Sequence, residues 1–268
     1  MSPTFSARTV RRTAAALVTA ALLVPLAACG SDDDSEGKEG VGGGGGKSVK
    51  LTVLAASSLT DVFATAEKTY EKAHPGTDIT VSPAGSQELA AQVKQGAPAD
   101  VLVTADTKTM DGLKGETGQP TVIAKNRLVI ATREGNPEKV KGLKDLGDSK
   151  LKVVLADDTV PVGRYSKQVL DAQNVSVKPV SKEANVRSVL SKVELGEADA
   201  GIVYRTDAAT APDKVDAVTI PDAQNAVASY PAATLKGSKN GDAAAGFVKW
   251  LSTPEAQKIL RDAGFQKP

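Results

Sequence analysis

The 268-residue sequence contains one cysteine, one histidine and one tryptophan, and aromatic residues make up only 3% of it. The one histidine, His74, lies in a His-Pro-Gly turn that is typical of a helix stop, and no second histidine or thiol is available around which a catalytic triad, a Cys-His pair or a histidine-containing metal cluster could be assembled. With so few aromatic rings, we expect the core to consist of Ala, Val, Leu and Ile. The composition therefore argues against the commonest hydrolase and metal-ion chemistries.

Neither excess charge nor a long apolar run is present in the body of the chain. The sequence has 33 basic and 32 acidic residues, a net charge of +1. A near-neutral surface argues against a nucleic-acid partner, which calls for a clustered basic face. No apolar stretch after residue 28 is long enough to span a bilayer.

The single cysteine, Cys29, follows an N-terminal segment that has the pattern of an export signal. Arg8, Arg11 and Arg12 precede an apolar stretch over residues 14–26, too short for a bilayer-spanning helix. The sequence LAAC that ends at Cys29 resembles a bacterial lipobox, which predicts a signal peptide over 1–28 and a lipid on Cys29. The mature chain would then be extracytoplasmic and anchored to the cell membrane. An ordinary cleaved signal that leaves a free thiol is the alternative, and the Arg11-Arg12 pair leaves twin-arginine export open.

Removal of residues 1–28 leaves 240 residues and, with three arginines lost, a net charge of −2. Residues 29–48 include five consecutive glycines and no hydrophobic pattern, which predicts a flexible tether. The run Gly46-Lys47-Ser48 ends like a phosphate-binding P-loop, but Val41 stands where that motif requires glycine. The acidic run over 32–34 is interpreted as solvated spacer.

The rest of the chain alternates apolar strand patterns with amphipathic helix patterns, which predicts an α/β fold with largely parallel sheets and helices on both faces. The predicted strands are 49–56, 79–81, 101–104, 127–132, 151–156, 200–204, 215–220 and 232–235. The predicted helices are 59–73, 86–95, 143–146, 163–172, 186–195, 242–251 and 254–263.

Four junctions that lead into helices carry small polar residues or tight turns. They are Ala56-Ser57-Ser58, Ala84-Gly85-Ser86, Val160-Pro161-Val162-Gly163 and Glu183-Ala184-Asn185-Val186. In α/β folds ligands bind beyond the carboxyl ends of strands, where helix N-termini direct free N–H groups and partial positive charge. This arrangement predicts an oxyanion site. A simpler interpretation makes Ser58, Ser86 and Asn185 helix N-caps only, and Tyr204 a packing residue at a strand end.

Taken together, these motifs resemble a family. The sequences LTVLAASSLTDVF (51–63), GSQELAAQVKQGAPADVLVTAD (85–106), VPVGRYSKQVL (160–170), EANVRSVLSKVELGEADAGIVYRTDA (183–208) and YPAATLKGSKN (230–240) are similar to those of molybdate-binding proteins, the solute-binding lipoproteins of molybdate ABC transporters. The resemblance covers nearly the whole body and implies a two-lobed periplasmic-binding-protein fold of type II, each lobe a mostly parallel sheet flanked by helices. It implies a first lobe over 49–127 plus 229–268 and a second over 128–228, with hinges near 125–128 and 226–230.

The resemblance also implies the ligand and its donors. Ser58 and Ser86 would bind molybdate or tungstate through side chain and backbone, Val162 and Val186 through backbone N–H groups, and Tyr204 through its hydroxyl. Ser57 is a possible extra contact. The oxyanion would be the only ligand, with no cofactor and no direct cation ligands. The implied partner is an ABC permease, and we expect a monomer.

Two arginines near these donors, Arg164 and Arg187, are expected to form ion pairs rather than to bind the ion, because neutral donors suffice for a dianion. Two alternatives stay open. One is a receptor for sulfate or phosphate. The other is a secreted carboxylate-dependent hydrolase using Asp157 and Asp158, although a turn role is favoured for that pair. The sole histidine, His74, is interpreted as a helix stop.

Overall fold

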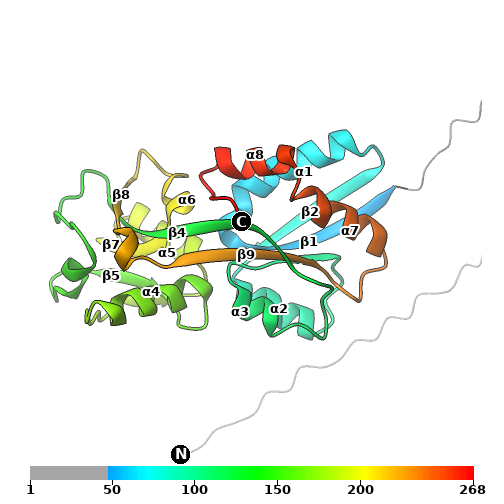
Figure 1. Ribbon diagram of the computed structural model, residues 1–268. Helices are drawn as coiled ribbons and strands as arrows, with labels where there is room; N and C mark the ends of the chain where they lie inside the picture. The colour runs from blue at the N-terminus through cyan, green and yellow to red at the C-terminus, as the bar shows by residue number, and fades with distance from the viewer. Residues whose placement is uncertain (1–47) are drawn as a thin grey trace, which may run out of the picture. The chain divides into compact units, whose positions relative to one another are not determined.

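The computed structural model describes residues 48–268, and these form one compact unit with two lobes (Figure 1). The predicted signal peptide, Cys29 and all of the predicted tether except its last residue lie outside the described residues. Within 48–268, no helix has both the length and the apolar composition needed to cross a membrane.

The first lobe is built on a sheet in the strand order β2-β1-β3-β9-β4. The chain forms β1 (Val49–Ala56), β2 (Thr77–Ala84) and β3 (Val101–Val103) as parallel neighbours, since each is followed by a helix that returns the chain. The strand β9 (Val227–Thr234) runs antiparallel to β3 and to β4 (Thr121–Arg133).

The second lobe continues the order as β4-β7-β5-β6, and β8 also pairs with β4. The strands β5 (Val153–Ala156), β6 (Ser181–Glu183) and β7 (Ala200–Tyr204) are parallel, whereas β7 and β8 (Val215–Thr219) run antiparallel to β4. All the antiparallel pairs involve β4 or β9, the two long strands that lie side by side between the lobes in Figure 1.

The partner of β4 changes in the middle of the strand. Arg127 is still paired with Val227 of β9, and the next residue, Leu128, is paired with Tyr204 of β7. A thirteen-residue strand thus belongs to both lobes, which joins them by continuous backbone.

Helices cover both sheets. In the first lobe these are α1 (Thr60–Ala73), α2 (Ser86–Lys94), α3 (Thr107–Asp111), α7 (Gly241–Trp250) and α8 (Pro254–Asp262). In the second lobe they are α4 (Pro161–Ala172), α5 (Val186–Glu194) and α6 (Arg205–Ala208). Within residues 48–268 there are also the short 3-10 helices η1 (Ser57–Leu59), η2 (Leu143–Gly147) and η3 (Asp222–Gln224).

The core is aliphatic, as the composition predicts. Most of its buried side chains are Ala, Val, Leu or Ile. The aromatic residues form two groups: Phe63, Tyr70, Phe247 and Trp250 meet edge-on or stacked under the first lobe's helices, and Tyr204, Tyr230 and Phe265 meet edge-on in a second group.

The sequence pattern found most elements and missed the shortest ones. The strands expected at 79–81 and 232–235 fall largely within the longer β2 and β9. The expected strands are too short because the outer parts of β2 and β9 carry polar residues or proline, which weaken the strand pattern. The expected strand at 127–132 is the second half of β4, and the expected helix at 143–146 is the 3-10 helix η2. The elements α3, β6 and α6 have three to five residues each and show no detectable period.

Candidate functional site

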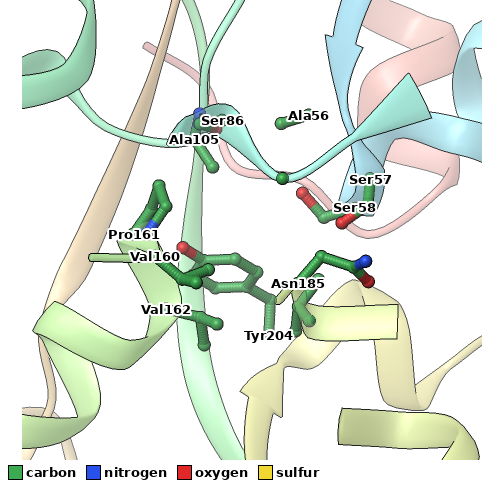
Figure 2. Close-up of a pocket in the computed structure, with 12 residues that line it drawn as sticks. Ala56, Ser57, Ser58, Ser86, Ala105, Val160, Pro161, Val162, Asn185 and Tyr204 are labelled. Carbon is green, nitrogen blue, oxygen red and sulfur yellow. Dashed lines mark hydrogen bonds between the residues drawn. The ribbon is translucent and has the colours of Figure 1, made fainter. Parts of the chain in front are cut away.

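One pocket is lined by all six residues that we predicted from the sequence to bind the ligand. Ser57, Ser58 and Ser86 come from the first lobe, and Val162, Val186 and Tyr204 from the second. All six are buried, and the cavity between them is small, about 10 Å³ for the centre of a water molecule. Figure 2 shows Ser57, Ser58 and Ser86 facing Val160, Pro161, Val162 and Asn185 across it. The remaining lining residues are Ala56, Gly85 and Ala105.

Four helices begin at this pocket. The first residues of η1, α2 and α5 are Ser57, Ser86 and Val186, and Val162 is the second residue of α4, after Pro161. Amides in the first turn of a helix have no acceptor within the helix, and the N-terminus carries partial positive charge. The backbone thus presents N–H donors from both lobes to one small space.

The glycine after Val162 is required by a close backbone approach. A Cβ atom at Gly163 would lie 2.0 Å from the carbonyl oxygen of Asp157, far inside van der Waals contact. Glycine therefore lets the first turn of α4 rest on the loop that follows β5, and this fixes the direction of the Val162 amide.

Two serine hydroxyls in the pocket already hold hydrogen bonds on their protein side. The Ser86 Oγ accepts the Ala105 N–H at 3.0 Å, and the Ser58 Oγ lies 2.9 Å from the Tyr230 Oη. A hydroxyl has one proton to donate and two lone pairs. Ser86, whose oxygen accepts from the protein, is therefore left with its proton available to a ligand.

The interpretation of these two serines as N-caps is wrong. The N-cap of α2 is Gly85 and that of α1 is Leu59, while Ser58 lies inside η1. The Ser86 hydroxyl bonds to Ala105 and the Ser58 hydroxyl to Tyr230 instead, and neither partner lies in the helix that its serine was expected to cap. Asn185 does cap its helix, because its Oδ1 accepts the Ser188 N–H at 3.0 Å.

Tyr204 is the most unusual polar group in the site. Its side chain is only 1% exposed, and its hydroxyl has no hydrogen-bond partner. Burial, with smaller contributions from Tyr230 and other neighbours, raises the pKa of Tyr204 well above its ordinary value, so the hydroxyl stays protonated. An unpaired buried donor costs about 1–3 kcal/mol, which indicates that it is placed for a ligand.

No charged side chain is among the residues that line the pocket in the described part of the chain. As predicted, Arg164 and Arg187 form ion pairs: Arg164 with Asp106, and Arg187 with Asp61 and Asp207. Burial raises the pKa of Asp207 to about 6, although Arg187 acts in the opposite direction.

The other candidate groups have structural roles. The Asp157 carboxylate accepts the N–H and the hydroxyl of Thr159, and Asp158 pairs with Lys182, which confirms the turn role of the two aspartates. His74 is the C-cap residue of α1, as expected for a helix stop. Sequence reasoning missed the supporting roles of Ala105 and Tyr230. Ser58 and Tyr230 are 172 positions apart, so no local signal links them.

A two-lobed α/β fold with a buried, uncharged pocket between the lobes defines a solute-binding protein. The sequence is 37% identical over 255 residues to the molybdate-binding protein ModA of Mycobacterium tuberculosis, an alignment that covers 94% of this chain and 97% of that protein. The chain belongs to the bacterial extracellular solute-binding proteins, whose family model matches residues 51–266, and within them to the ModA proteins.

Solved structures agree on the fold. The periplasmic molybdate-binding protein of Azotobacter vinelandii has a TM-score of 0.70 at 23% identity and covers 81% of this chain and 99% of its own. The sulfate-binding protein SubI of Mycobacterium tuberculosis has a TM-score of 0.74 at 18% identity, over 82% of this chain and 87% of its own. At these identities the likeness concerns the fold, so the choice of ion must be argued from the site.

Proposed function

We propose that this protein is an extracytoplasmic receptor that captures molybdate, and equally tungstate, between its lobes and delivers the ion to an ABC permease. The observation that carries the proposal is the Tyr204 hydroxyl, buried without a partner in a pocket entered by four helix N-termini. A tetrahedral oxyanion bound there would supply the missing acceptor. The protein is a receptor and not an enzyme, since it belongs to the bacterial extracellular solute-binding proteins.

Five residues would hold the ion with uncharged donors. Ser58 and Ser86 would each donate a hydroxyl and a backbone N–H, Val162 and Val186 a backbone N–H, and Tyr204 its hydroxyl. Several charge-assisted hydrogen bonds can replace the hydration shell of a dianion without a countercharge. Ser57 also lines the pocket and would offer a further hydroxyl.

The donor set also gives selectivity. An ion that keeps a proton, such as hydrogen phosphate, needs an acceptor, and a group of donors leaves that proton unpaired. Sulfate carries the same charge as molybdate and is smaller, so size alone separates the two. A sulfate receptor is therefore the second candidate, since the sulfate-binding protein SubI has a similar fold.

Lobe closure is part of this proposal. We assign 49–127 plus 229–268 to the first lobe and 128–228 to the second, and the change of partner along β4 after Arg127 supports that division. The proposed donors divide between the two, so the full set assembles only when the lobes meet.

The remaining parts of the proposal concern the whole chain. The mature protein would be anchored to the membrane through a lipid on Cys29, act as a monomer and need no cofactor besides the transported ion. Mass spectrometry of the membrane-extracted protein would test the lipid, since the mature N-terminus must then be an acylated cysteine.

Titration calorimetry of the purified protein with molybdate, tungstate, sulfate and phosphate tests the function. We expect similar tight binding of the first two, weak binding of sulfate and none of phosphate. Sulfate bound as tightly as molybdate would refute the assignment and favour the sulfate receptor.

A further inference from the structure

Three arginines of the second lobe reach across to the first, and two of them, Arg164 and Arg187, pair there with aspartates. Arg187 in α5 donates from Nη2 to the Asp61 Oδ2 in α1 at 2.6 Å, while its Nε donates to the Asp207 Oδ1 within its own lobe at 2.7 Å. A third bond, from Nη1 to the Thr210 Oγ1, is 3.3 Å long.

The second crossing lies at the start of α3. Arg164 in α4 donates from Nε to the Asp106 Oδ2 at 3.0 Å and from Nη2 to the Thr109 Oγ1 at 2.8 Å, and Nη2 also contacts Asp106. The Asp106 carboxylate is nearly fully buried in this arrangement and also caps α3. Both arginine side chains are mostly buried, with 22% and 26% exposure for Arg164 and Arg187.

The residues of each ion pair across the lobes are close in sequence to the proposed donors. Arg187 follows Val186 directly, and Asp61 lies three residues after Ser58. Arg164 lies two residues after Val162 on the same helix. Its partner Asp106 directly follows Ala105, whose N–H holds the Ser86 hydroxyl. Each ion pair therefore joins a donor segment of one lobe to a donor segment of the other.

We propose that Arg164 and Arg187 are positioning residues that hold the two lobes closed around the bound ion without touching it. Neither residue lines the pocket. Bonds that exist only between closed lobes favour the closed state, and the apparent affinity for a ligand rises with the population of the binding-competent state. The inference rests on the proposed function, because it concerns closure over that ion.

Asp61 offers the cleanest test, because its side chain is 61% exposed and its loss leaves Arg187 paired with the buried Asp207. The variant Asp61→Asn removes one negative charge. If only the long-range field mattered, an anion would bind this variant more tightly. Loss of the crossing bond has the opposite effect. We expect a molybdate dissociation constant about 2- to 10-fold higher than in the wild type.

The matched control is Asp111→Asn. Asp111 is also an exposed acid of the first lobe, at 56%, but its partner Lys114 lies within the same lobe. Calorimetric titration with molybdate should give wild-type or slightly tighter binding for this control. Asp61→Glu, which keeps the carboxylate, should recover most of the lost affinity. The two Asn variants should have similar melting temperatures without ligand. The Asp61 bond to Arg187 is absent when the lobes are open, and the exposed pair of Asp111 and Lys114 contributes little to stability.

The outcomes separate the two proposals. Wild-type or tighter molybdate binding by Asp61→Asn, while the wild type binds, would overturn the positioning role and leave the receptor function standing. Failure of the glutamate variant to restore affinity would also overturn it. No molybdate binding by the wild type would refute the function and the inference together.

Discussion

Replacing Tyr204 with phenylalanine should lower affinity for the ion and leave the stability of the ligand-free protein unchanged. The substitution removes one oxygen and keeps the ring, which packs edge-on against Tyr230 at a centroid distance of 5.9 Å. The hydroxyl lacks a partner only where the lobes enclose it, and in the open ligand-free protein we expect it to face water, so its removal should cost nothing there. With the ion bound, the same change removes a charge-assisted hydrogen bond.

The magnitudes follow from those two states. Loss of the bond to the ion should weaken binding by about 1–3 kcal/mol, which is about 5- to 150-fold in the dissociation constant. Without the ion, the melting temperature of the variant should match that of the wild type, because water replaces the partner that the hydroxyl lacks in the closed arrangement.

Calorimetric titration with molybdate and thermal unfolding with and without the ion measure both quantities. Tyr70→Phe is the control, because Tyr70 is a buried tyrosine of the first lobe that does not line the pocket. That variant should keep wild-type affinity. Unchanged molybdate affinity in Tyr204→Phe would remove Tyr204 from the site, and a lower ligand-free melting temperature would show that its hydroxyl already has a partner.

Three further predictions concern groups around the pocket. Tyr230→Phe frees the Ser58 hydroxyl from its 2.9 Å bond, so it should lower molybdate affinity about 3- to 10-fold in calorimetry; wild-type affinity would contradict the role of Tyr230 in directing Ser58. A Cβ at Gly85 would lie 2.6 Å from the Ala184 carbonyl oxygen of the opposite lobe, so Gly85→Ala should weaken binding but leave the ligand-free melting temperature unchanged. Because the pKa of Asp207 is raised to about 6 by burial, the folded protein holds a proton there that the unfolded chain releases near pH 4. The stability that this proton contributes is complete below about pH 4 and is lost as the pH rises through 6. Denaturant titrations should therefore show the wild type losing stability relative to Asp207→Asn between pH 4 and pH 6. A stability difference that stays constant with pH would contradict the raised pKa.

The sequence could predict the position of the site because local rules decide it. Strands that run parallel end at the same edge of a sheet, so the residues after β1 and β2 meet in the first lobe and those after β5 and β6 meet in the second, and the helix starts that follow supply free N–H groups. Tyr204 lines the pocket for the same reason, since it ends β7, which runs parallel to β5.

What the sequence could not predict depends on contacts between distant segments. Ser58 and Ser86 fit the helix-start pattern, yet Tyr230 and Ala105 take the hydrogen bonds that a cap would have made. The residues that pair the lobes, Asp61 with Arg187, are 126 positions apart and carry no local pattern. Such pairings follow only from how the two lobes come together.

The closed protein balances two opposing sets of interactions. Ion pairs across the lobes favour closure, while the unpaired Tyr204 hydroxyl and the helix amides lose contact with water when the pocket closes empty, which costs free energy. An oxyanion removes the second cost, because its oxygens accept from every one of those donors, and leaves the first contribution intact. If the ion pairs alone outweighed the empty pocket, the receptor would close without cargo. A group of unpaired donors therefore makes closure depend on the ion.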